Sequence, residues 1–369
     1  MSELHPSEDP RRHCLMVEHW PAADRRAWEQ ALQPGDLLDG TVGRGFYWAE
    51  QTRAKYRKGY GRWLTFLTVS GRLDPSAAPA SRITPDAVQA YIAELSSSVS
   101  SWTLWGRLAE LLAVAKIMAP DVDWSWLRGA VRYYETNSKV SRDKLPRLRP
   151  SGEISAWAFK RMDELIAHRI SVRHCDSHYR DALAIALLIY CPTMRLGNLA
   201  MIEIDKHLIR MTDGYRLSFA PKETKTRKPF AIPIPSSLTP YIEHYLDRVR
   251  PALLGSTESL RLWITRYGQP MTGKALHLGI TKATKRAFGR SINPHLFRDC
   301  AVTTVALEDL THIGIAAPIL GHTDPRTTEA HYIQANAIVA GRRLGQSIDT
   351  LRKQNRPTHH KRHHGGRSQ

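Results

Sequence analysis

Large apolar side chains recur at helical spacing in the first half of the chain. From Tyr56 to Leu67 they fall at three- and four-residue spacing, the period of an amphipathic helix, at Tyr56, Tyr60, Trp63, Leu64 and Leu67. A second helix is predicted to begin at Thr84, because a capping hydroxyl followed by Pro85 and Asp86 favours a helix start. Its apolar stripe comprises Val88, Tyr91, Ile92 and Leu95.

Two further helices complete a predicted bundle over residues 45–140. The serine-rich run Ser96–Ser101 caps a helix that ends before Pro120 and whose apolar side comprises Leu104, Leu108, Leu111, Leu112 and Ala115. Another helix is predicted from about Trp124 to Tyr134. We therefore expect a compact helical domain in this part of the chain.

The pattern is mixed over residues 152–350. Ala182–Cys191 is a continuous apolar run and predicts a buried helix. Leu208–Met211 and Tyr215–Ala220 flank the turn dipeptide Asp213-Gly214, which is typical of a β-hairpin. Phe230–Ile234 predicts one more strand, and helices return after Thr272. The predicted fold class is mainly α with a small antiparallel β-sheet.

Three segments lack these patterns. Residues 1–44 are predicted to be an N-terminal extension with a short helix near Ala22–Leu32. The stretch Ser138–Ser151 holds five basic residues, two prolines and one acid, so we expect a linker over residues 141–151 that lies along DNA. The basic tail, residues 351–369, is expected to be disordered until it meets DNA.

Charge narrows the class of partner. Lysine and arginine number 53 against 35 acids, so the formal net charge is +18, which indicates a polyanionic partner such as double-stranded DNA. The first predicted helix, which carries the stripe Tyr56–Leu67, also has a basic face with no acid between its cations. This face predicts contact with phosphates rather than a merely solvated surface; it comprises Arg53, Arg57, Lys58 and Arg62.

Other classes of protein are disfavoured. The ten-residue apolar run at Ala182–Cys191 is about half of a bilayer span, and no secretory signal is expected from the charged first twenty residues. The four cysteines are scattered, which favours a reducing cytoplasm over a disulfide framework. His13-Cys14 and His174-Cys175 lack zinc-ligand spacing, so no metal and no cofactor are expected.

Four local patterns carry candidate chemistry. Arg195 follows the predicted buried helix, and Lys225 lies in a basic turn between two strands. His295 and Arg298 are one helical turn apart and project on one face. Leu320-Gly321-His322 precedes a lone tyrosine, Tyr332, which has no other tyrosine after it.

In this order the patterns resemble the tyrosine recombinase family, which includes phage integrases and Xer-type enzymes; the resemblance covers roughly residues 45–345. It implies an N-terminal helical core-binding (SAM-like) bundle and an α+β catalytic domain that form a C-shaped clamp around duplex DNA. It further implies a site-specific recombinase of mobile elements or chromosomes. Such an enzyme acts as a homotetramer, exchanges strands through a Holliday junction, and is found in the cytoplasm in association with the nucleoid. The segment after Tyr332 is then suited to pack on a neighbouring subunit.

The chemistry explains the residue types. Transesterification needs an oxygen nucleophile, positive charge at two phosphoryl oxygens and a proton for the departing 5′ oxygen. The forked donors of Arg195 and Arg298 match the phosphoryl oxygens. Lys225 is a movable proton donor, and His295 and His322 can exchange protons or hold the phosphate. The resemblance assigns Tyr332 as the nucleophile that becomes attached to the 3′ phosphate.

Some alternatives stay open. Lys222 and Lys228 share the turn with Lys225, and Arg195 could instead cap the preceding helix. His322 and Tyr332 could be packed structural residues. A type IB topoisomerase, or a catalytically idle DNA-binding protein, would share much of this pattern.

Two positions depart from the family. Asn198 stands where the family often has an acid, three residues after the first arginine. His331 occupies the usual place of the nucleophile, so Tyr332 lies one residue further from His322 than in many members.

Overall fold

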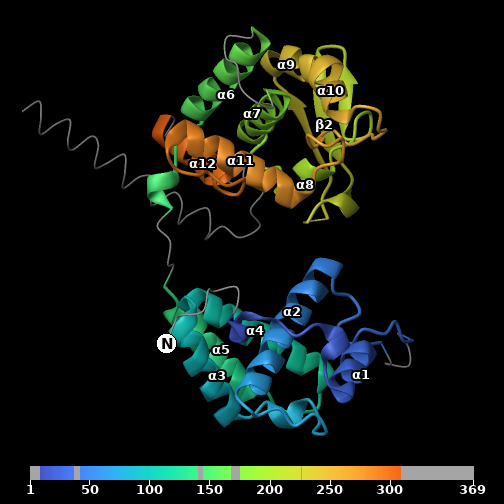
Figure 1. The fold of residues 1–369 in the computed structure, drawn as a ribbon, viewed down its shortest axis with the longest axis vertical. Coiled ribbons are helices and arrows are strands. Elements are labelled where there is room, and N and C mark those ends of the chain that lie inside the picture. The colour runs from blue at the N-terminus through green and yellow to red at the C-terminus, as the bar shows by residue number, and fades with distance from the viewer. Residues whose placement is uncertain (1–8, 37–41, 140–143, 168–174, 226, 309–369) are drawn as a thin grey trace, which may run out of the picture. The chain divides into compact units, whose positions relative to one another are not determined.

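The computed structural model describes residues 9–36, 42–139, 144–167, 175–225 and 227–308. The chain divides into two compact units, unit 1 (Met1–Asp143) and unit 2 (Lys144–Gln369), each with its own hydrophobic core (Figure 1). The described residues form a mainly α fold with one small antiparallel sheet, as the sequence predicts.

Unit 1 is a helical bundle in its described residues. Its helices are α1 (Ala22–Ala31), α2 (Glu50–Val69), α3 (Pro85–Ser98), α4 (Ser101–Met118) and α5 (Ser125–Asn137). The predicted caps are confirmed, since the side chain of Thr84 accepts from the amide of Ala87 and that of Ser100 accepts from the amide of Thr103. The predicted apolar stripe of α2 faces the core: Tyr60, Trp63, Leu64 and Leu67 are buried.

The N-terminal segment is part of this core. Trp20 and Trp28 are buried, and the ring of Trp20 packs edge-on against Tyr60 at 5.0 Å. Asp24 is 0% exposed and accepts a 2.6 Å hydrogen bond from the Tyr60 hydroxyl while it pairs with Arg82. The sequence predicts the short helix here correctly, but the structure makes it a packed part of unit 1, because its tryptophans and its acid find buried partners there.

A close backbone approach fixes the entry of this segment. The amide of Leu15 donates to the carbonyl of Gly61 at 3.0 Å, within α2. A Cβ atom at Gly61 would lie 2.2 Å from the carbonyl oxygen of Leu15, so only glycine allows the two main chains to come this close.

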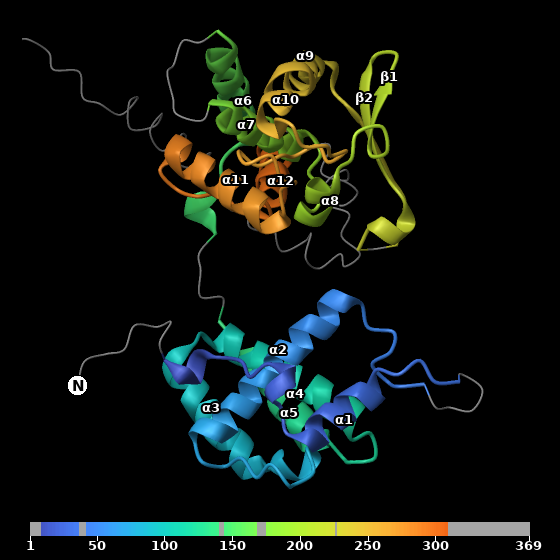
Figure 2. The same cartoon turned by 45° about the vertical axis from the view of Figure 1, so that its right-hand side comes forward.

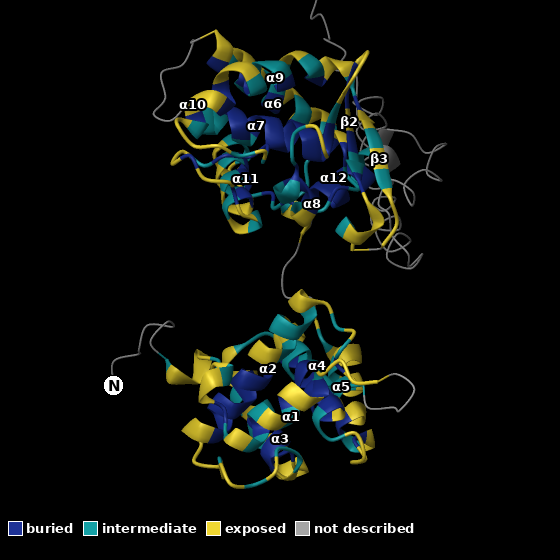
Figure 3. Cartoon of the chain, turned by 90° about the vertical axis from the view of Figure 1, so that its right-hand side faces the viewer, coloured by how far each residue is buried: buried dark blue, intermediate teal, exposed yellow. Residues whose placement is uncertain are grey.

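Unit 2 is built around one buried helix. Its helices in the described residues are α6 (Ser151–Ile166), α7 (Cys175–Tyr190), α8 (Leu196–Met201), α9 (Thr239–His244), α10 (Arg250–Leu254), α11 (Gly273–Phe288) and α12 (Leu296–Glu308). The predicted buried helix is confirmed as the second half of α7, where residues 182–189 are all buried. Figure 3 shows α7 in dark blue at the centre of the unit, and α6 packs along it.

The sheet has the predicted strands in the order β1–β2–β3, all antiparallel. The strands are β1 (Leu208–Met211), β2 (Gly214–Phe219) and β3 (Phe230–Ile234). Gly214 closes the first hairpin with a φ of +133°, a conformation that glycine adopts without strain. The sheet lies at one edge of unit 2 (Figure 2), and the β2–β3 connection carries Lys225.

The segment before α6 is fixed to unit 2. Lys144 Nζ lies 3.3 Å from Asp299 Oδ2, and Arg147 Nε donates to the carbonyl of Ser291 at 2.8 Å. The amide of Ser151 donates to Thr304 Oγ1 at 2.7 Å. The described part of the predicted linker therefore contacts α12 and the residues just before it.

Candidate active site

Arg195 stands between two helices of unit 2. The turn after α7 is closed by the amide of Met194, which donates to the carbonyl of Cys191 at 2.9 Å. Arg195 then has extended backbone angles and is the N-cap residue of α8. Its guanidinium donates no hydrogen bond to another described residue, so it does not cap α7, the alternative left open by the sequence.

Arg298 reaches the same turn from α12. Its side chain is buried, and its guanidinium donates to the carbonyl of Thr193, two residues before Arg195. Burial first, and then the positive charge of Arg195, lower the pKa of Arg298 to about 10. Two guanidinium groups that repel each other are therefore held together, an arrangement that an oxyanion would stabilise.

His295 begins the same helix. The side-chain oxygen of Asn293 accepts from the amides of His295 and Leu296, both at 3.1 Å, and so starts α12. Loss of solvent around the ring holds the pKa of His295 below its ordinary value; Asp299 opposes this, and the cations Arg298, Lys144 and Arg195 add to it. This shift favours the neutral imidazole, the form that can accept a proton.

Lys225 comes to this region on the β2–β3 connection. It is exposed, as are Lys222 and Lys228, so exposure alone does not choose among the three. Asn198 connects the turn to α8, because its Nδ2 donates to the carbonyl of Glu223 at 3.0 Å. The residue at the family's acid position thus bridges the helix that begins after Arg195 and the turn that carries Lys225.

His322 and Tyr332 lie outside the described residues. Of the predicted catalytic set, the structure brings Arg195, His295 and Arg298 together and connects Lys225 to them through Asn198.

The structure adds charged residues that the sequence reasoning did not single out. Asp299 is buried beside His295 and Arg298, and its position four residues after His295 is a signal that could have found it. Lys144 is 155 residues distant in sequence from its partner Asp299, so local pattern offers no signal for that pair.

The basic face of α2 needs a correction. Arg57 and Lys58 are exposed, and the guanidinium of Arg53 donates to the main-chain carbonyls of Trp48 and Phe46. Arg62 is buried, because it pairs with Glu94 and lies over the ring of Tyr91 at 5.6 Å. Arg62 is therefore an internal counter-ion, and the exposed basic face is narrower than predicted.

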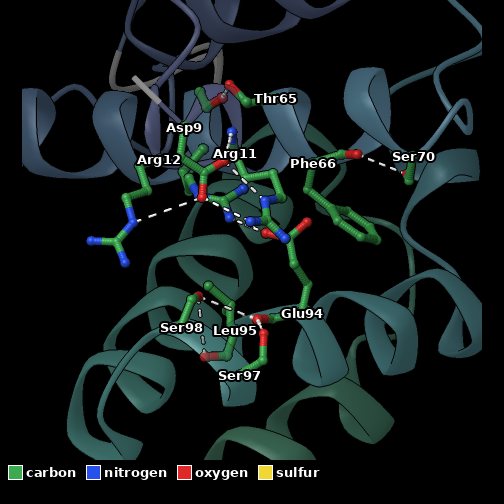
Figure 4. A network of polar contacts seen from close by, with 12 residues as sticks. Asp9, Arg11, Arg12, Thr65, Phe66, Ser70, Glu94, Leu95, Ser97 and Ser98 are labelled. Atoms are coloured by element: carbon green, nitrogen blue, oxygen red, sulfur yellow. Dashed lines mark hydrogen bonds and ion pairs between the residues drawn. The ribbon is translucent and has the colours of Figure 1, made fainter. Parts of the chain in front are cut away.

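Glu94 belongs to a wider polar network on this side of unit 1. Figure 4 shows Arg11 close to Glu94, with Asp9 beside them. Asp9 accepts two hydrogen bonds from the guanidinium of Arg11, at 2.9 and 3.0 Å, and pairs with Arg12 at 3.9 Å. The acids here are engaged with cations of the same unit.

The described residues offer neither a metal centre nor a membrane span. No group of three or more histidine, cysteine, aspartate or glutamate residues among them is arranged to hold a metal ion. No helix in that part of the chain is long and apolar enough to cross a bilayer.

Part of unit 2 is similar in sequence to known proteins. Residues 160–337 match the sequence model of the phage integrase family. The curated relatives include the tyrosine recombinase XerD of Staphylococcus saprophyticus, 29% identical over 154 residues, and that of Staphylococcus haemolyticus, 29% identical over 157 residues. Each match covers 42% of this chain, and the chain spans about half the length of these relatives.

Solved structures agree on the fold. The XerH site-specific recombinase bound to difH substrate, in a pre-cleavage complex, has a TM-score of 0.55 at 15% identity, over 89% of this chain and 95% of that chain. The post-cleavage complex of the same recombinase, with a palindromic difH substrate, has a TM-score of 0.51 at 15% identity, over 79% and 77%. Residues 160–337 thus match the phage integrase family, and the chain is similar in sequence to tyrosine recombinases and in fold to a site-specific recombinase.

Proposed function

We propose that this protein is a site-specific DNA recombinase that cleaves and rejoins double-stranded DNA by transesterification. One observation carries the proposal: Arg195 and Arg298, from two segments about a hundred residues apart, converge on one turn although their charges repel. A phosphodiester brings negative charge to this pair, and its two non-bridging oxygens match two forked donors.

The other residues supply proton transfer. Tyr332 attacks the phosphorus, its phenolic proton passes to a neutral histidine, and the 5′ oxygen leaves with a proton from Lys225. The depressed pKa of His295 supports its role as the proton acceptor. His322 is assigned by the resemblance to hold the phosphate. The product is a 3′-phosphotyrosine ester, which conserves the energy of the broken bond for rejoining.

The assembly is proposed with the chemistry. Relatives named as XerD tyrosine recombinases, and a structural neighbour named as bound to its DNA site, support DNA as the partner. We infer a homotetramer on two DNA sites that exchanges one pair of strands and then the other through a Holliday junction, in the cytoplasm at the nucleoid. The net charge of +18 supports the polyanionic partner.

Nicked suicide DNA tests the nucleophile. The wild-type protein should accumulate a covalent complex that survives denaturant, and Tyr332→Phe should bind DNA but form none, because only the hydroxyl is removed. His331→Ala should still form the complex. A peptide map that places the DNA on any residue other than Tyr332 would overturn the assignment.

Two activity assays separate the recombinase from its alternatives. A tetrameric recombinase should join two DNA sites and produce Holliday junctions, whereas a type IB topoisomerase should relax supercoils without a second site. Absence of both activities together with tight DNA binding would identify a catalytically idle binder and refute the proposal.

A further inference from the structure

The Glu223 carboxylate is an anchored group at the start of the β2–β3 connection. Its Oε2 accepts from the amide of Ala220 at 2.9 Å, and its Oε1 lies 3.3 Å from His207 Nε2 and 3.2 Å from Lys206 Nζ. The amide of Ala220 is the largest influence that lowers the pKa of Glu223 to about 2, against burial and with help from His207 and Lys206. The group is therefore a fixed carboxylate at every working pH.

His207 is a rigid partner for this carboxylate. Its side chain is 1% exposed, and its ring stacks on Phe219, the last residue of β2, at 5.0 Å. The amide of Glu203 donates to its Nδ1 at 3.0 Å, so the ring proton is on Nε2, which faces Glu223. The imidazole is thus locked in one tautomer and one orientation.

The main chain of Glu223 is held from the opposite side. Asn198, buried on α8, donates its Nδ2 to the Glu223 carbonyl at 3.0 Å. One residue later, Thr224 Oγ1 donates to the carbonyl of Lys228 at 2.7 Å and closes the turn that contains Lys225. Glu223 is therefore the point where α8, the hairpin and the Lys225 turn are joined.

We propose that Glu223 is a positioning residue that fixes the Lys225 turn relative to the helix begun by Arg195. The inference rests on the proposed function, in which Lys225 is the proton donor. As the Tyr332 oxygen–phosphorus bond forms and the phosphorus–5′ oxygen bond breaks, the proton moves from the Lys225 ammonium to the departing oxygen and leaves a neutral amine. A misplaced turn would slow this transfer and no other step, because the phosphate is held by the arginines.

The test compares two nicked DNA substrates, one with the normal 5′ oxygen and one with sulfur in its place. A thiolate leaves without a proton, so a defect in proton donation disappears with the sulfur substrate. Glu223→Ala should slow cleavage of the oxygen substrate roughly 10- to 100-fold and of the sulfur substrate less than about threefold. The matched control is Glu243→Ala on α9, which removes an exposed ion pair to Arg210 on β1 (Arg210 Nη2 to Glu243 Oε1, 2.7 Å) and should leave both rates unchanged.

Lys225→Ala separates this inference from the function on which it rests. If the sulfur substrate restores the cleavage rate of Lys225→Ala but not that of Glu223→Ala, the positioning role of Glu223 is wrong and the role of Lys225 stands. Equal slowing of Lys225→Ala on both substrates would overturn the role of Lys225 and the inference with it. If Glu223→Ala does not fold, Glu223→Gln replaces it, because glutamine keeps one acceptor for the Ala220 amide. The ratio of its cleavage rates on the sulfur and oxygen substrates then tests the positioning role in the same way.

Discussion

Asp24→Ala should destabilise unit 1 far more than an ordinary substitution in an N-terminal segment. The side chain is fully buried and serves two partners, the hydroxyl of Tyr60 and the guanidinium of Arg82. Alanine would leave a buried arginine whose Nε and Nη1 already have no hydrogen-bond partner among the described residues.

The magnitude follows from these contacts. Removing one member of a buried ion pair costs about 3–5 kcal/mol, because the remaining charge stays desolvated. Loss of the acceptor for the Tyr60 hydroxyl adds about 1 kcal/mol or more, although the two losses share one site and are not additive. We therefore expect a decrease of about 4 kcal/mol in the unfolding free energy of unit 1. For a unit of this size that corresponds to a fall in Tm of about 15 °C.

Urea unfolding of the full chain provides the assay. Eight of the ten tryptophans lie in unit 1, so their fluorescence reports chiefly on this unit. The matched control is Arg72→Ala, which removes the exposed pair between Arg72 and Asp86 and should cost less than about 1 kcal/mol. If Asp24→Ala lowers the unfolding free energy by less than about 1 kcal/mol, the reasoning is refuted, and residues 9–36 would be an extension that contributes little to the stability of unit 1.

Three further results are expected. Arg57→Ala with Lys58→Ala should lower the log–log salt slope of DNA binding by about 2, whereas Arg62→Ala should leave that slope unchanged and lower thermal stability; the reverse pattern would contradict the burial of Arg62. Inorganic sulfate should raise the Tm of the wild type more than that of Arg195→Ala, and an equal rise would contradict an anion site at the arginine pair. The depressed pKa of Glu223 means that its stabilising contribution is present above about pH 4.5 and lost as the pH falls towards about 2; acid titration of Glu223→Gln should lack this loss, and an unchanged acid profile would contradict the anchored carboxylate.

Sequence patterns predict those features of the fold that depend on residues close together in the chain. The apolar stripe of α2, the caps at Thr84 and Ser100, the buried half of α7 and the Asp213-Gly214 hairpin all depend on residues a few positions apart. Such short-range rules are readable from one sequence. The order and spacing of the arginine, lysine and histidine motifs predicted the family in the same way.

Partners distant in sequence escape this kind of reasoning. Arg62 has the spacing of an exposed cation, and only the position of Glu94 on α3 makes it an internal ion pair. Asp24 looks like a helix-start acid until Tyr60 and Arg82 surround it. Glu223 reads as a surface residue in a basic turn, yet it contacts His207 and accepts from Asn198 through its carbonyl. Each of these outcomes depends on tertiary packing, which periodicity does not encode.

Three contacts determine where the chain can be truncated or joined in a chimera; they are made by Lys144, Arg147 and Ser151. These residues hold unit 2 to Asp299, to Ser291 and to Thr304, on or just before α12. A fragment that begins at residue 152 would discard all three contacts beside His295 and Arg298, whereas one that begins at residue 144 keeps them. Chimeras that exchange unit 1 between relatives should therefore place the junction between the two sequences before residue 144.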